Sequence, residues 1–136
     1  MVQDIIQHHQ PFDFDKFFQD ETSKYINIDY NDYQTLFKEE GEVHSFIGES
    51  DSDYRVKDAI ANAVSSNEAE RILGMVKAAM IILVHSSDAQ RPFAMDEIQA
   101  VTEFVSNLPE SCDVVWGISQ DQTIGNTVNV MLLVRI

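Results

Sequence analysis

Residues 78–84 form an unbroken apolar run, Ala-Ala-Met-Ile-Ile-Leu-Val, between Lys77 and His85. Such a continuous run is typical of a strand that is buried on both faces, because a solvent-exposed face would carry alternating polar residues. The run is also too short to cross a bilayer as a helix. The chain is therefore expected to fold around a buried strand at about 77–86.

Other apolar segments predict the partners of this strand. Segments near 42–48, 113–119 and 127–135 have β-branched and aromatic character and are bounded by turn-forming residues. Apolar residues at helical spacing predict helices that begin near Asp29, Asp53 and Ala94. Helices that cross between strands predict an α+β fold, namely a two-layer sandwich in which a four-stranded sheet carries the helices from Asp53 and Ala94 on one face. The last two strands are expected to pair as a hairpin, closed by the loop at 120–126.

The N-terminal segment predicts two smaller elements. Apolar residues lie along one side of 2–9, which predicts the tail of a helix that Pro11 interrupts. Four phenylalanines follow within 12–18, and they predict a small amphipathic helix that packs on the domain. If these rings were exposed instead, they would form an adhesive patch and therefore a site for a partner.

The charge and cysteine content narrow the classes of partner. The chain has 23 acidic and 9 basic residues, which give a formal net charge of −14. A surface this acidic repels phosphate backbones, so nucleic acid and anionic membranes are not expected as partners. Cys112 is the only cysteine, so no disulfide can form within the chain, and the N-terminus lacks the basic and apolar regions of a signal peptide. These features predict a cytoplasmic protein.

The stretch 25–32, Tyr-Ile-Asn-Ile-Asp-Tyr-Asn-Asp, places Asn27, Asp29 and Asp32 in a short window before a predicted helix. If the helix begins near Asp29, the two acids share its first turn, where backbone N–H groups and the helix dipole stabilise carboxylates. Asp29 could therefore be a simple N-cap. A calcium loop is excluded, because its sixth position would be Asp32 rather than Gly and its twelfth Lys38 rather than Glu.

The remaining polar residues give no strong site. His8 and His9 are adjacent, and side chains one residue apart on a helix diverge rather than share a metal. His44 and His85 could approach each other only if their strands paired. Cys112 has no basic neighbour in sequence, so a buried or inert thiol is expected. No metal site is predicted.

The order of these elements and several short stretches resemble the C-terminal domain of the bacterial tubulin homologue FtsZ. The stretch 26–32 resembles the catalytic synergy loop of that family. Further similar stretches are 2–5 for the end of the central helix, 41–48 for a strand, 58–66 for an alanine-rich helix ending in Ser-Ser, 82–84 and 95–97 for a strand and helix, and 114–117 and 128–134 for the final strands.

Three departures from the family pattern accompany this resemblance. The connection 4–24 is longer than the family's short link, and Gln34 stands where a basic residue is expected. The 5 glycines are dispersed, so no Gly-rich loop can hold phosphates with backbone N–H groups. The family's C-terminal tail has no counterpart after Ile136. The resemblance thus implies two regions, the helix end and Phe-rich connection at 1–24 and the FtsZ-like C-terminal domain at 25–136, without the nucleotide-binding half.

The resemblance also implies a function. In the family, nucleotide bound to one subunit meets the synergy loop of the next subunit, which couples GTP hydrolysis to filament assembly in cell division. By resemblance, Asp29 and Asp32 would orient the attacking water and Asn27 would position the loop or contact nucleotide. The cofactor, GTP with Mg, belongs to the family's other half, so this chain alone is expected neither to bind nor to hydrolyse GTP nor to form filaments. The expected partner is another FtsZ-like subunit or its nucleotide-binding half.

Two alternatives stay open at this stage. One is a stand-alone module that binds or caps a filament end without a part in catalysis. The other is a small metabolic enzyme with active sites between subunits, since small α+β sandwiches host many activities. An anion-substrate site is disfavoured, because 9 basic residues stand against 23 acidic ones.

Overall fold

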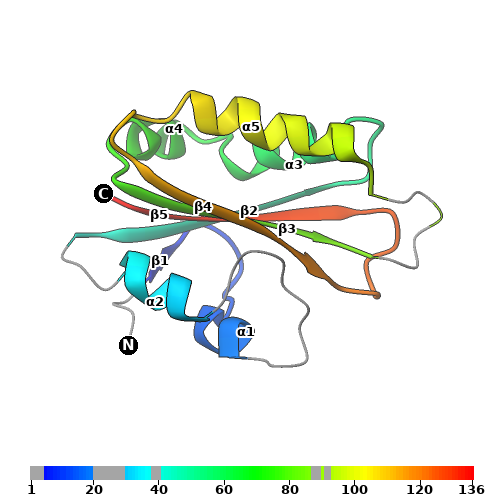
Figure 1. The fold of residues 1–136 in the computed structure, drawn as a ribbon, viewed down its shortest axis with the longest axis horizontal. Helices are drawn as coiled ribbons and strands as arrows, with labels where there is room; N and C mark the ends of the chain where they lie inside the picture. Colours follow the sequence, from blue (N-terminus) through cyan, green and yellow to red (C-terminus); the bar gives the residue numbers. More distant parts are fainter. Residues whose placement is uncertain (1–4, 20–29, 38–40, 87–89, 91–92) are drawn as a thin grey trace.

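A computed structural model of the chain describes residues 5–19, 30–37, 41–86, 90 and 93–136. Figure 1 shows its elements in sequence colours. In chain order they are β1 (Ile5–Gln7), α1 (Phe14–Gln19), α2 (Tyr30–Phe37), β2 (Val43–Ser50), α3 (Arg55–Ala63), α4 (Asn67–Leu73), β3 (Ala78–His85), the 3-10 helix η1 (Met95–Glu97), α5 (Ile98–Ser106), β4 (Asp113–Gln120) and β5 (Val128–Arg135). The α+β class is confirmed, and β2 to β5 lie where the four strands were predicted.

The described strands form one mixed sheet in the order β1-β2-β5-β3-β4. β5 runs antiparallel to both its neighbours, whereas β1 pairs parallel with β2 and β4 pairs parallel with β3. The predicted hairpin of the last two strands is therefore wrong, because β3 lies between β4 and β5. Every β5 residue except Asn129 is buried, and a strand that is apolar on both faces buries more surface in the middle of a sheet than at its edge.

β1 is the fifth strand and stands where the tail of a helix was predicted. Ile5 pairs with Val43 and Gln7 with Ser45, and the N–H of His8 continues the ladder by donating to the Ser45 carbonyl at 3.0 Å. Adjacent β-branched residues favour extended backbone, and the edge of β2 supplies unpaired N–H and C=O groups. These two effects outweigh the weak helical spacing of a segment that lacks a cap.

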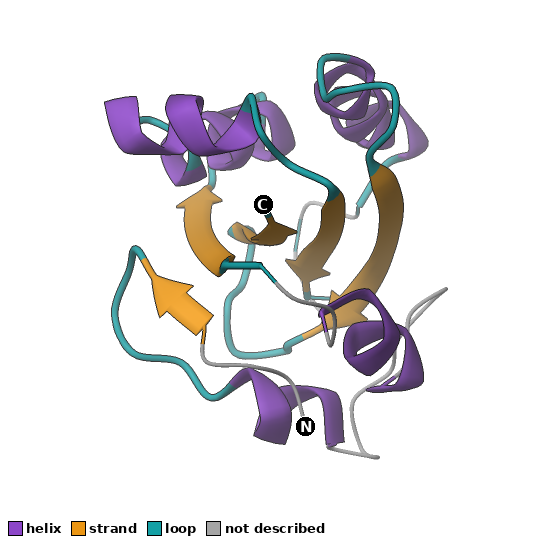
Figure 2. Cartoon of the chain, turned by 90° about the vertical axis from the view of Figure 1, so that its left-hand side faces the viewer, coloured by secondary structure: helices purple, strands orange, loops and turns teal. Residues whose placement is uncertain are grey.

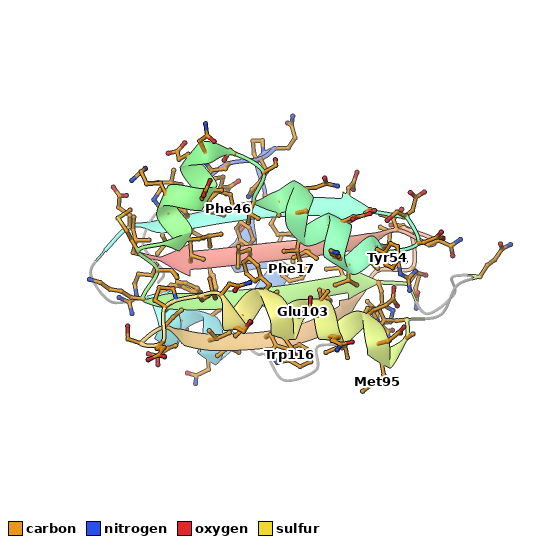
Figure 3. All side chains as sticks on the ribbon, turned by 90° about the horizontal axis from the view of Figure 1, so that it is seen from above. Phe17, Phe46, Tyr54, Met95, Glu103 and Trp116 are labelled. Atoms are coloured by element: carbon orange, nitrogen blue, oxygen red, sulfur yellow. The ribbon has the colours of Figure 1, made fainter. Side chains whose placement is uncertain are left out.

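Three helices cover one face of the sheet, above it in Figure 1 and in the turned view of Figure 2. α3 and α5 are the two helices predicted for this face, and α4 lies in the connection between α3 and β3. The Ser66 hydroxyl caps α4 by accepting from the Ala69 N–H at 3.0 Å. Trp116 of β4, labelled in Figure 3, packs against the core on this face, which is called the upper core. The buried members of the upper core are Phe46, Val56, Ala59, Ile60, Ala69, Ile72, Val76, Ala79, Ile81, Leu83, Val101, Val128, Val130, Leu132 and Val134.

The opposite face carries α1 and α2, which lie below the sheet in both views. Alternate residues of β3 point to opposite faces of the sheet, and all residues of the apolar run 78–84 are buried. The prediction that this run is buried on both faces is therefore confirmed. Phe14 of α1 is buried, which confirms that the Phe-rich segment packs on the domain. The lower core consists of Phe14, Tyr33, Phe37, Val43, Met80, Ile82, Val84, Met131 and Leu133.

Gly48 sets the closest approach between β2 and α3. A Cβ at this position would overlap the Ala59 carbonyl oxygen and the Ala63 nitrogen, which are backbone atoms of α3 and cannot move aside alone. We expect Gly48→Ala to lower the free energy of unfolding by about 1–3 kcal/mol or more, measured by urea denaturation.

Gly74→Ala is the matched control, because a Cβ there meets nothing closer than the Arg71 carbonyl at 3.5 Å. Its backbone is right-handed, so we expect this variant to gain about 0.4–1 kcal/mol. Equal effects of the two substitutions would contradict the described packing of α3 on β2.

Candidate functional site

The candidate site is the N-terminal end of α2, the helix that follows the acidic stretch. α2 is held on the lower face by Tyr33 and Phe37, which are 1% and 0% exposed. The two residues are one helical turn apart, so they share a face, and their ring centroids lie 6.1 Å apart. They pack in the lower core with side chains of β3 and β5. The first turn of α2 is therefore held in a fixed position against the sheet.

The three predicted site residues are only partly within the described structure. Asn27 and Asp29 lie outside the described residues. Asp32 lies in the first turn of α2, which agrees with the predicted helix start, but its side chain is not among those described. Asn31, next to it, is exposed. The catalytic assignment of the three residues thus remains a prediction.

The Phe-rich segment lies on the same face as α2 (Figures 1 and 2). Phe12 contacts Phe14 and Phe17, with ring centroids 4.8 and 5.5 Å away. The Gln7 side chain fixes the start of this segment, because it donates to the Phe12 carbonyl at 2.8 Å and accepts from the Phe12 N–H at 2.9 Å. The segment is thus joined to β1 at one end and packs in the lower core at the other.

A groove of about 570 Å³ lies on the upper face between α3 and the η1–α5 helix. A buried ion pair joins its two sides: Arg55 Nε donates to Glu97 Oε1 at 2.6 Å, and the Arg55 side chain is 1% exposed. Arg55 also donates to the Asn126 carbonyl at 2.9 Å. The lining residues are Asp53, Tyr54, Val56, Lys57, Ala94, Asp96, Glu97, Gln99, Ala100 and Glu103. Figure 3 shows Tyr54 and Met95 at the same end of this helical layer.

Sequence reasoning missed the Arg55–Glu97 pair. A cation in the first turn of a helix is unfavourable for the helix dipole, and α3 begins at Arg55. This unfavourable position of Arg55 could have indicated the ion pair, because a basic residue in the first turn of a helix needs an acidic partner from elsewhere in the fold. The helix predicted to begin near Asp53 is α3, which begins two residues later, at Arg55.

The histidines and Cys112 show no metal-binding arrangement. Within the described residues, no group of three or more His, Cys, Asp or Glu side chains could hold a metal ion. His44 and His85 are on strands that β5 separates. Burial and the adjacent Asp113 carboxylate raise the pKa of the Cys112 thiol, which keeps it protonated and unreactive at neutral pH. Burial lowers the pKa of His85.

The fold is that of the tubulin/FtsZ C-terminal domain. Two structures of M. jannaschii FtsZ superpose on the chain: an empty dimer with a TM-score of 0.63 and a mutant with a TM-score of 0.66. Each is 29% identical to this chain, and each match covers 82% of this chain and 32% of the FtsZ chain. Bacillus thuringiensis TubZ, in GDP-form protofilaments, superposes with a TM-score of 0.61 over 79% of this chain and 29% of the other, at 11% identity, which supports the fold alone.

Sequence comparison also finds FtsZ proteins. The cell division protein FtsZ 1 of Thermococcus kodakarensis is 32% identical over 110 residues, which is 80% of this chain and 28% of that protein. FtsZ 1 of Pyrococcus woesei is 30% identical over the same share of the chain and 29% of its own length. The chain is therefore similar in both sequence and fold to the C-terminal domain of FtsZ.

Two further findings bound this similarity. The chain spans 28% to 29% of the length of these two curated relatives, and no family model matches it. Within the described residues, no helix combines the length and apolar character that a membrane span requires.

Proposed function

We propose that this chain acts as the C-terminal half of an FtsZ-like cell-division filament protein in the cytoplasm. In this role it supplies the synergy loop that completes the GTPase site of the neighbouring subunit. The observation that carries the proposal is the anchoring of α2 by Tyr33 and Phe37 directly after the stretch 26–32, because that stretch resembles the synergy loop in sequence and its last residue, Asp32, belongs to the first turn of α2. That anchoring would present the loop from a rigid element.

The proposed chemistry needs little beyond positioning. Phosphoryl transfer from GTP requires a water aligned with the γ-phosphate and stabilisation of the charge that develops there. Asp29 and Asp32 would hold this water and accept its proton, and Asn27 would fix the loop or contact nucleotide. GTP and Mg would be bound by the partner subunit, since the 5 glycines of this chain are dispersed and form no phosphate-binding loop.

The test supplies this chain to an FtsZ relative whose own synergy-loop acids have been replaced. That relative still carries GTP, so phosphate release depends on acids from outside. We expect the intact chain to stimulate phosphate release, while the chain alone should show no GTP binding by calorimetry and no turnover. Absence of stimulation despite measurable binding of the chain would overturn the proposal.

A second candidate is a stand-alone module that binds and caps a filament end. The observation that favours it is the Phe-rich segment, which packs on the same face as α2 and links β1 to the lower core. Such a segment could hold the loop away from a neighbouring nucleotide. The same experiment separates the two candidates, because a capping module would shorten filaments in electron micrographs without stimulating phosphate release.

A further inference from the structure

His8 and His44 join the N-terminal strand to the sheet through their side chains. His8 Nε2 and His44 Nδ1 lie 2.8 Å apart, and the two rings are within 13° of parallel with centroids 5.1 Å apart. This geometry is a hydrogen bond in which the rings meet edge to edge. The His8 ring also stacks on Phe46, with centroids 4.6 Å apart and planes within 6°. His8 thus ties β1 to β2 by its ring as well as by its backbone N–H.

Each end of the histidine pair faces a carboxylate. His44 Nε2 lies 3.1 Å from Glu42 Oε1, and His8 Nδ1 lies 3.8 Å from Glu68 Oε2 of α4. His44 is 3% exposed, so its ring has almost no contact with water. The four groups form a line from β2 through the segment after β1 to α4. Figure 3 places Phe46, on which His8 stacks, beside α4.

The number of protons on this line decides whether it holds together. Two neutral rings carry one proton between them and one toward a carboxylate. One added proton gives both carboxylates an N–H to accept, so every contact is satisfied. A second added proton places an N–H of His8 against an N–H of His44 at the 2.8 Å spacing. The hydrogen bond between the rings is then replaced by repulsion of two adjacent cations, of which the one on His44 is buried.

We propose that the His8–His44 pair is a proton-operated latch that holds β1 on the edge of β2. The latch is closed while the pair is neutral or carries one added proton, and the second added proton opens it. Opening removes β1 from β2 and leaves the edge of β2 unpaired. This device is independent of the synergy loop and of the function proposed above.

The charged and titratable groups around the latch come from each neighbouring element. Glu68 on α4 and Glu42 before β2 face its two ends. His9 lies beside it but bonds elsewhere, with Nε2 at 2.7 Å from the Ser45 hydroxyl and Nδ1 at 2.7 Å from the Gln10 carbonyl. Arg71, on α4, lies 3.8 Å from the other oxygen of Glu68. The two carboxylates offset part of the cost of the first added proton, whereas His9 and Arg71 offer no acceptor to either proton.

The sign of the pH dependence follows from His8. Burial lowers the pKa of His8, the Glu68 carboxylate opposes this shift, and His44 and His9 add to it. An unfolded His8 therefore takes up a proton more readily than the docked one. The stabilisation of β1 is complete above the unfolded pKa of about 6.5 and is lost as the pH falls below it toward the folded pKa.

Hydrogen–deuterium exchange of the full chain tests the latch at about pH 8 and about pH 5, the range over which histidine changes charge. The exchange rates are first corrected for the intrinsic pH dependence of amide exchange. Protection of the amides in 5–10 is then expected to fall as the pH is lowered, by up to about tenfold per pH unit for each proton that is taken up on opening. Protection of β3 in the same sample is the internal reference and should not fall with it.

His44→Gln is the decisive variant, because a Gln side chain does not titrate. Its amide oxygen can accept from the Nε2–H of His8 whether His8 is neutral or protonated. We expect the amides of β1 in His44→Gln to remain protected from exchange at about pH 5. His8→Gln is expected to behave in the same way and replaces His44→Gln if that variant does not fold. His9→Gln is the matched control and should keep the acid-dependent loss. Equal wild-type protection at both pH values, or the same loss in the Gln variants of His8 and His44, would overturn the proposal.

Discussion

Glu97→Ala is expected to lower the free energy of unfolding by about 3–5 kcal/mol, because it breaks a buried ion pair from one side. Arg55 is 1% exposed, and both Glu97 oxygens accept from its guanidinium, at 2.6 and 3.0 Å. Removing the carboxylate takes both of these acceptors from the buried cation, and the Asn126 carbonyl, which is neutral, stays among its partners. The Ala94 N–H at the start of η1 loses its acceptor as well. Urea denaturation measures the loss.

Two further variants separate the ion pair from the loss of a side chain. Glu103→Ala changes an exposed acid on α5, the helix that follows η1, and is expected to alter stability by less than about 0.5 kcal/mol. Arg55→Met combined with Glu97→Leu removes both charges and should recover most of the stability lost in Glu97→Ala. A loss below about 1 kcal/mol in Glu97→Ala would show that Arg55 reaches water and that the pair does not hold α3 to η1.

Asp29→Ala and Asp32→Ala are each expected to reduce stimulated GTP turnover by about 10²- to 10⁴-fold, the usual contribution of a positioned proton acceptor. Their effect on folding should be only that of a helix cap, about 0.5–2 kcal/mol. The two effects separate catalysis from structure, because a pure cap would lose stability and keep turnover. Phosphate release and urea denaturation on the same preparations measure both quantities. Asn31→Ala, an exposed neighbour on α2, is the matched control and should change neither.

The sheet shows what the sequence could and could not predict. The apolar run 78–84 correctly predicted a strand buried on both faces, because the run has no polar residue at either alternate position. The pairing of β4 with β5 was predicted wrongly, since chain proximity suggested a hairpin. The crossover through α5 instead places β4 parallel to β3, and the doubly apolar β5 occupies the space between β2 and β3. Strand order depends on contacts between distant residues, which local patterns do not record.

The N-terminal segment illustrates a second limit. Ile5 and Ile6 fit both a helical and an extended pattern, and the free edge of β2 decides between them. The partners of His8 lie 36 and 60 positions away in sequence, at His44 and Glu68, so no spacing rule predicts them. The packing of the Phe-rich segment was predicted, because several aromatic rings in a short segment have a strong drive for burial.

The candidate site was predicted from resemblance rather than from local chemistry. An acid in the first turn of a helix is common as a cap, so the residues alone left the cap and the catalytic role open. The fold adds that α2 is anchored through Tyr33 and Phe37, which fixes the element that carries Asp32. The similarity to FtsZ covers 80% of the chain and gives the acids their proposed partner, a nucleotide on another subunit.

The most direct measurement is phosphate release from GTP by an FtsZ relative that lacks its own synergy-loop acids, with this chain added intact or as the Asp29→Ala, Asp32→Ala double variant. Binding of each chain to the relative is followed in parallel. We predict that both chains bind and that only the intact chain stimulates release, with Asn31→Ala equal to the intact chain. Equal release with the intact chain and the double variant would contradict the central claim, because the acids would then serve only to begin α2.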